Sequence, residues 1–173
     1  LIIERSMSLQ RRKILPPGIV EEVVALHRNR QLTPDMVQRV ERSSSLGRIM
    51  ANGLRHEFEP RDMMKDAMEE TGRAVAHDLE RYLPALGTLA TVSPLLGLFG
   101  TVIGMIEIFG AQSPTGSNPG QLAHGISVAL YNTAFGLVIA IPSLIFWRYF
   151  RARVDEYLMT LELSSERLVR HLN

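Results

Sequence analysis

Charged and apolar positions are distributed very unevenly along the chain and divide it into two kinds of segment. Lys and Arg occur throughout residues 1–81 and again from Arg148 onward, but none lies between Tyr82 and Trp147. That stretch contains one acid, Glu107, which separates two uncharged runs. Each run has at least the ~20 apolar residues that a helix needs to cross a bilayer. The pattern predicts an all-α membrane protein with transmembrane helices at 82–109 and 122–147.

The connection between these two spans, residues 110–121, reads GAQSPTGSNPGQ and carries no charge. Its Gly, Pro, Ser and Asn content is typical of a turn. Because Lys and Arg accumulate on the cytoplasmic side of membrane proteins, the turn is predicted to face the periplasm. Both basic flanks, 1–81 and 148–173, are then cytoplasmic.

The flanks show helical patterns of their own. A short helix is expected at 19–29, and Thr33 followed by Pro34 reads as an N-cap with proline at the first helical position. A second helix is expected from Pro34, and the SSSLG segment at 43–47 either breaks or loosens it. From Pro60 onward the pattern predicts one helix of about 50 residues leading into the first span, since the apolar spacing stays helical. The second span is expected to continue as a long helix through the 148–173 tail.

The chain opens with LIIERS, and two interpretations of this segment stay open. It resembles the last turn of an apolar helix leaving a membrane at Glu4 and Arg5, which would make it the end of an upstream first span. The alternative is the frayed end of a soluble segment.

Composition and charge exclude several functions. There is no cysteine, and the five His residues do not occur at metal-ligand spacing, so neither a disulfide framework nor a metal site is expected. A formal net charge of +1 gives no electrostatic footprint for nucleic acid. No nucleophile, base and orienting group occur together and no Gly-rich phosphate loop is present, so a membrane-embedded enzyme is a poor interpretation and no cofactor is expected.

Small residues recur at spacings of three and four in both spans. Such ridges let helices approach closely within lipid, where packing drives association. The residues expected to pack in this way are Gly97, Gly100, Gly104, Gly125, Ala129 and Gly136.

Two threonines lie on these small faces near mid-membrane. Thr101 is about 12 Å from the end of the first span, and Thr133 about 16 Å from the start of the second. Their hydroxyls either bond to their own helix backbone or form a polar lining for an ion. No acid or base lies beside them, so a proton pathway would need a carboxylate from a partner. Glu107, near the outer end, is either a solvated end residue or a charge that attracts ions to an outer entry.

The two spans together resemble the MotA/TolQ/ExbB proton-channel family, most closely its ExbB/TolQ branch. The resemblance rests on LGTLATVSPLLGLFGTVIGMIEIF at 86–109 and GISVALYNTAFGLVIAIPS at 125–143. It covers about a third of the chain.

The resemblance implies a multi-pass protein of the bacterial inner membrane with three spans and a large cytoplasmic region. It implies a homopentamer around a dimer of single-span ExbD- or TolR-like partners that supply a membrane Asp. It places Thr101 and Thr133 at the pore threonines of the family. The implied function is a pore subunit that uses the proton motive force to drive an envelope partner, such as a TonB- or TolA-like protein.

One position departs from the family pattern. Many ExbB and TolQ proteins carry glutamate five residues before the second pore threonine, where this chain has Val128. The departure leaves open whether the chain serves a Ton, a Tol or another energised system. A passive scaffold in an envelope or secretion complex and a MotA-like stator subunit are the alternative functions.

Overall fold

The computed structural model describes residues 1–110, 116 and 118–172, and every regular element in these residues is an α-helix. Two of the helical stretches are long and apolar enough to cross a membrane, Arg61–Gly110 and Pro119–Leu172. The predicted all-α class is therefore confirmed for this part of the chain. Half of the predicted 110–121 turn, residues 111–115 and 117, lies outside the described residues, and its last three residues already belong to the helix that starts at Pro119. The chain divides into two compact units, residues 82–149 and residues 1–81 together with 150–173.

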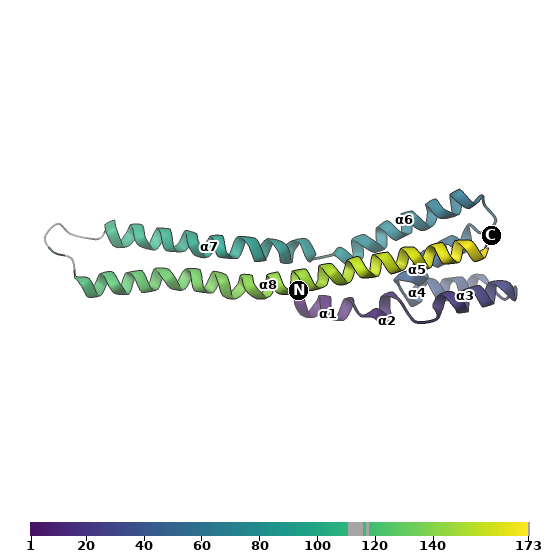
Figure 1. The fold of residues 1–173 in the computed structure, drawn as a ribbon, viewed down its shortest axis with the longest axis horizontal. Helices are drawn as coiled ribbons and strands as arrows, with labels where there is room; N and C mark the ends of the chain where they lie inside the picture. Colours follow the sequence, from purple (N-terminus) through teal and green to yellow (C-terminus); the bar gives the residue numbers. More distant parts are fainter. Residues whose placement is uncertain (111–115, 117, 173) are drawn as a thin grey trace. The chain divides into compact units, whose positions relative to one another are not determined.

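The first unit is a hairpin of two antiparallel helices, α7 (Leu83–Gly110) and residues 119–149 of α8 (Pro119–Leu172), which lie side by side in Figure 1. Pro94 and Pro142 lie inside these helices without ending them. Large apolar side chains remain exposed on the outer faces of both helices, including Leu95, Phe99 and Val138. A helix that is apolar on all sides is typical of a membrane span.

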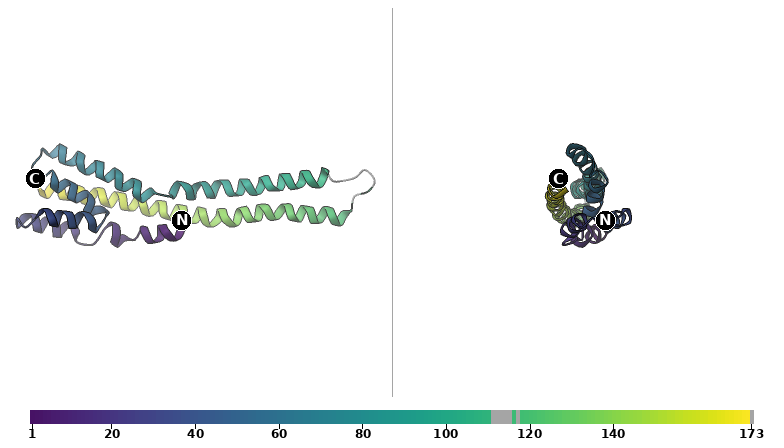
Figure 2. Two further views of the ribbon diagram at one scale, coloured as in Figure 1. Left: turned by 180° about the vertical axis from the view of Figure 1, so that it is seen from behind. Right: turned by 90° about the vertical axis from the view of Figure 1, so that its right-hand side faces the viewer.

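The second unit is a bundle of short helices packed against α6 and the C-terminal part of α8, which Figure 2 shows from behind. Its core contains side chains with almost no exposed surface, among them Val23, Met50, Val154 and Tyr157. The helices are α1 (Ile2–Ser8), α2 (Arg11–Ile14), α3 (Ile19–Arg28), α4 (Pro34–Ser43), α5 (Ser45–Arg55) and α6 (Arg61–Glu80).

Two of the predicted helix starts are capped by side chains. The Thr33 hydroxyl accepts a hydrogen bond of 3.4 Å from the Met36 N–H, as the Thr-Pro signature predicts. The Ser44 hydroxyl accepts one of 3.0 Å from the Gly47 N–H, so the SSSLG segment ends α4 and starts α5. The break, rather than the loosened helix, is the observed outcome.

The prediction of one uninterrupted helix from Pro60 into the first span is wrong. α6 ends at Glu80 and α7 begins at Leu83, with Tyr82 between them at a φ of 65°. The sequence does contain a stop signal that the apolar spacing concealed. Pro84 cannot donate a hydrogen bond to Glu80, and proline is suited to the first turn of a helix, so it favours a new helix start at this point.

An ion pair joins α4 to α5 in this bundle. Arg55 donates hydrogen bonds to both carboxylate oxygens of Glu41, and these bonds, assisted by the nearby positive charges, hold the pKa of Glu41 below its usual value. A carboxyl group with a lowered pKa stabilises the fold at pH values above its unfolded pKa. This contribution is lost as the pH falls through the lowered value.

We expect Tyr157→Phe to lower the stability of the bundle by roughly 1–2 kcal/mol, because the change removes the partner of a buried carbonyl. The Tyr157 hydroxyl donates a 3.0 Å hydrogen bond to the Leu9 carbonyl, and its side chain is 1% exposed. Thermal unfolding followed by circular dichroism in detergent measures the loss. Tyr131→Phe is the control, since Tyr131 is 63% exposed, and equal stability of the two variants would contradict the role of the bond.

Candidate functional site in the helix hairpin

The small residues of α7 and α8 face one another within the hairpin. A Cβ atom on Gly97 would lie 2.7 Å from the Asn132 carbonyl oxygen and 2.9 Å from the Thr133 Cα. One on Gly136 would lie 2.6 Å from the Ser93 carbonyl oxygen. These are backbone atoms, so the two helices touch at these levels with no room for a side chain.

The remaining small residues extend this contact toward the 110–121 turn. Gly100 lies against the Asn132 side chain, with its Cβ position 3.0 Å from the Asn132 Cβ. Gly104 lies against Ala129, and Gly125 lies against Ile108. The ridge therefore runs along α7 and α8 in antiparallel register, and within one copy it serves the contact between the two helices.

Thr101 and Thr133 lie on the same side of this contact. Gly100 contacts Asn132 on one side of the hairpin. Thr101 follows Gly100 and Thr133 follows Asn132, and one residue corresponds to about 100° of rotation around a helix. Because the helices are antiparallel, both rotations lead to the opposite side of the hairpin. Gly97 faces Thr133, so the two threonines are about one helical turn, or roughly 6 Å, apart in depth.

The two hydroxyls differ in their hydrogen bonds. The Thr101 hydroxyl donates a 2.6 Å bond to the Leu98 carbonyl of its own helix. Ser127 and Ser143 of α8 bond back in the same way, to the carbonyls of Ala123 and Ile139. The Thr133 hydroxyl makes no hydrogen bond within the described residues. It is therefore free to donate to a group brought by another molecule.

Glu107 does not lie on the side that carries the threonines. It follows Thr101 by six residues, so the two side chains point about 120° apart around α7. Glu107 and Val128 are both exposed, and Val128 puts an apolar side chain where many relatives carry glutamate. The hairpin brings Thr101 and Thr133 together and leaves Glu107 on another face.

The side opposite the threonines has polar groups that the sequence analysis did not single out. The exposed Asn132 lines a groove of about 340 Å³ together with Gly97, Gly100 and the buried Ser93. An amide inside an uncharged run is itself a signal, because polar side chains are costly in lipid. The hairpin thus has two different sides, one with threonine hydroxyls and one with an amide.

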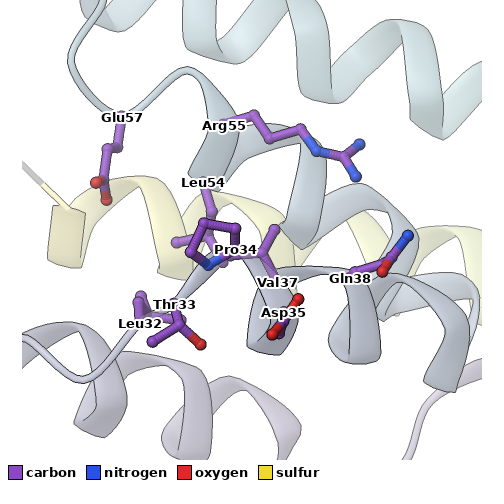
Figure 3. Close-up of a pocket in the computed structure, with 9 residues that line it drawn as sticks. All are labelled: Leu32, Thr33, Pro34, Asp35, Val37, Gln38, Leu54, Arg55 and Glu57. Atoms are coloured by element: carbon purple, nitrogen blue, oxygen red, sulfur yellow. The ribbon is translucent and has the colours of Figure 1, made fainter.

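The helical bundle contains a hollow of about 460 Å³ between the start of α4 and the end of α5 (Figure 3). Leu54 and Val37 contribute apolar surface, and Asp35, Arg55 and Glu57 lie around them. These charges do not form a catalytic set. No group of three or more His, Asp and Glu that could hold a metal ion occurs in the part of the chain that the structure describes.

Two apolar helices that pack through a close glycine contact and carry no charge at mid-length define an α-helical membrane protein. Residues 41–163 match the MotA/TolQ/ExbB proton channel family. This match covers most of the chain, and the chain belongs to that family.

Individual relatives place the chain in the ExbB/TolQ branch. It is 32% identical to a Synechocystis protein named ExbB-like 3, over 88% of this chain and 74% of that protein. It is 42% identical to the biopolymer transport protein exbB1 of Vibrio cholerae, over 51% of this chain and 39% of that protein. It is 38% identical to the Tol-Pal system protein TolQ of Haemophilus influenzae, over 56% of this chain and 44% of that protein. The chain therefore matches less than half the length of the last two relatives.

Proposed function

We propose that the chain is the pore-forming subunit of a motor in the bacterial inner membrane that is driven by the proton motive force. Five copies surround a dimer of single-span partners, and each partner carries an Asp within the membrane. A proton from the periplasmic side neutralises that Asp where it faces Thr101 and Thr133. Neutralisation permits a step of the dimer, and the motion drives a TonB- or TolA-like envelope protein.

The observation that carries this proposal is that the two threonines lie on the same side of a hairpin, within one helical turn of each other, and that no carboxylate of the hairpin lies beside them. The Thr133 hydroxyl is suited to hydrogen-bond a carboxylate from outside the chain, because none of the described residues binds it. Two helices cannot enclose a pathway, so several copies are needed to surround one. The names of the relatives, biopolymer transport and Tol-Pal proteins, support a motor whose motion acts on another envelope component.

A passive scaffold is the competing function, since a scaffold would use the same glycine contact without conducting protons. Proton flux measured with and without the single-span partner separates the two. A scaffold gives no flux in either preparation, whereas the proposed pore subunit conducts when the partner is present.

The proposed topology predicts that a cysteine in the 110–121 turn is reached from the periplasm and one in the helical bundle is not. The chain contains no cysteine, so single variants are sufficient. Ser117→Cys should react with an impermeant maleimide in cells with a permeabilised outer membrane. Phe58→Cys should react only after lysis, and it is suited to this test because Phe58 is 94% exposed. Labelling of Phe58→Cys in intact cells would overturn the orientation.

A further inference from the structure

The part of α7 between Thr101 and Gly110 carries a groove of about 470 Å³ that begins at the Thr101 side chain. Apart from Thr101, the residues that line it are all apolar: Val102, Met105, Ile106 and Phe109. Met105 and Phe109 follow Thr101 by four and eight residues, so they point only about 40° and 80° away from it around the helix. Apolar side chains of α7 therefore lie between Thr101 and the end of the hairpin at the 110–121 turn.

α8 presents the same kind of surface on the threonine side of the hairpin. Leu130 and Ile126 precede Thr133 by three and seven residues, so they point about 60° and 20° away from it. Both lie between Thr133 and the start of α8 at Pro119. Leu130 is 61% exposed and Ile126 is half-buried. Each helix thus places two apolar side chains between its threonine and the turn.

The polar side chains in the same stretch of α7 and α8 point to other faces. Glu107 points about 120° away from Thr101 around α7. On α8, every polar side chain between Pro119 and Thr133 is separated from Thr133 by about 100° of rotation or more. These residues are Gln121, His124, Ser127, Tyr131 and Asn132. Water molecules that enter from the turn on the threonine side therefore meet no polar side chain of these two helices before they reach the threonines.

An apolar stretch of this kind can close a pathway without filling it. Water in a narrow apolar passage loses hydrogen bonds that the walls cannot replace, so such constrictions gate by losing their water. Protons move along hydrogen-bonded water, and a dry passage excludes them as well. In the proposed assembly every copy brings the same apolar side chains to the threonine side, so together they surround the pathway between the threonines and the turn.

We propose that an apolar gate lies between the periplasm and the two threonines, and that it consists of Met105, Phe109, Ile126 and Leu130. This inference rests on the proposed function and adds the regulation of its proton pathway. The gate keeps the pathway dry, and so closed to protons, until the single-span partner occupies it. It is a barrier separate from the missing carboxylate, because it acts on water rather than on the proton acceptor.

The test is proton flux into liposomes that contain the full chain without its partner, driven by an imposed pH difference and membrane potential. The unmodified chain should hold the gradient. Met105→Gln keeps the length of the side chain and nearly its volume, and it adds an amide that binds water. We expect this variant to raise the flux about tenfold or more, because the gate becomes wet. Leu130→Asn makes the matching change on α8 and should act in the same direction.

Two control variants separate polarity at the gate from other effects. Met105→Leu changes the shape of the side chain but keeps it apolar, so the gradient should hold. Ile103→Gln adds the same amide to α7 on another face, because Ile103 follows Thr101 by two residues and points about 160° away from it. Its flux should stay at the level of the unmodified chain.

Oligomer size is measured on each preparation, and if one of the two polar gate variants does not assemble, the other decides. Flux at the unmodified level in an assembled gate variant, or equal flux through Ile103→Gln, would overturn the gate. Flux through the unmodified chain alone would overturn it too. The proposed function fails on a different result, the absence of flux when the unmodified chain is combined with its partner, and the gate variants are measured without that partner.

Discussion

Replacing Gly97 with leucine should separate the two helices of the hairpin and lower its stability by about 3 kcal/mol or more, at or above the upper end of what overpacking a close contact costs. The Cβ of the new side chain would stand 2.7 and 2.9 Å from backbone atoms of α8. Backbone cannot rotate away as a side chain can, so the helices have to move apart along the whole ridge. Thermal unfolding in detergent, with oligomer size measured on the same preparation, reports the effect.

Two other leucine substitutions provide the comparison. Gly110→Leu adds the same side chain at the end of α7, where nothing lies within 4 Å, and it should be tolerated. Gly100→Leu should be intermediate, because its contact is with the Asn132 side chain, which can change rotamer. Equal stability of the Gly97 and Gly110 variants would contradict the close contact between α7 and α8.

The spacing of the small residues was visible in the sequence, but the helix that they pack against was not. Glycines at intervals of three and four predict a flat helix face, and they do not say whether the face meets the same chain or another copy. The contacts of Gly97 and Gly136 with backbone atoms of the opposite helix place the ridge inside one hairpin. A leucine at Gly100 would thus act first on the hairpin and only through it on assembly.

Other features could not be predicted from the sequence, each for a different physical reason. The hydrogen bonds from Arg5 to the carbonyls of Asp78 and Leu79 join residues far apart in the sequence, so local pattern could not predict them. Pro84 was a local signal of the break between α6 and α7, but the helical spacing of apolar residues continues past it and predicted one helix. The side of the hairpin that carries Thr133 could not be assigned until the contact of Gly100 with Asn132 fixed the rotation of both helices. The difference in hydrogen bonding between Thr101 and Thr133 depends on side-chain rotamers, which spacing does not determine.

Thr133→Val should reduce proton-dependent activity about tenfold or more while folding and assembly survive. Valine is close to threonine in volume, and the change removes a hydroxyl that has no partner within the described residues, so little is lost in the chain itself. A hydrogen bond to a charged group contributes roughly 1.5–3 kcal/mol, so its loss against a partner carboxylate gives the expected effect. Activity is measured in cells or proteoliposomes that contain the single-span partner.

Related substitutions show whether this effect is specific. Thr101→Val should reduce activity less, because the Thr101 hydroxyl already donates to Leu98. Ser127→Ala removes a hydroxyl from the same helix that bonds to Ala123, and it should leave activity unchanged. If the Thr133 and Thr101 variants both keep full activity with their oligomers intact, the threonines do not line the pathway.

The most direct test of the proposed function is proton flux into liposomes that contain the chain with its single-span partner, driven by an imposed pH difference and membrane potential. The chain and the intact partner together should conduct protons. The chain alone, or the chain with a partner whose membrane Asp is changed to Asn, should not, because no carboxylate then lies at the depth of Thr101 and Thr133. Flux through the chain alone, or flux that survives the Asp→Asn change, would contradict the account.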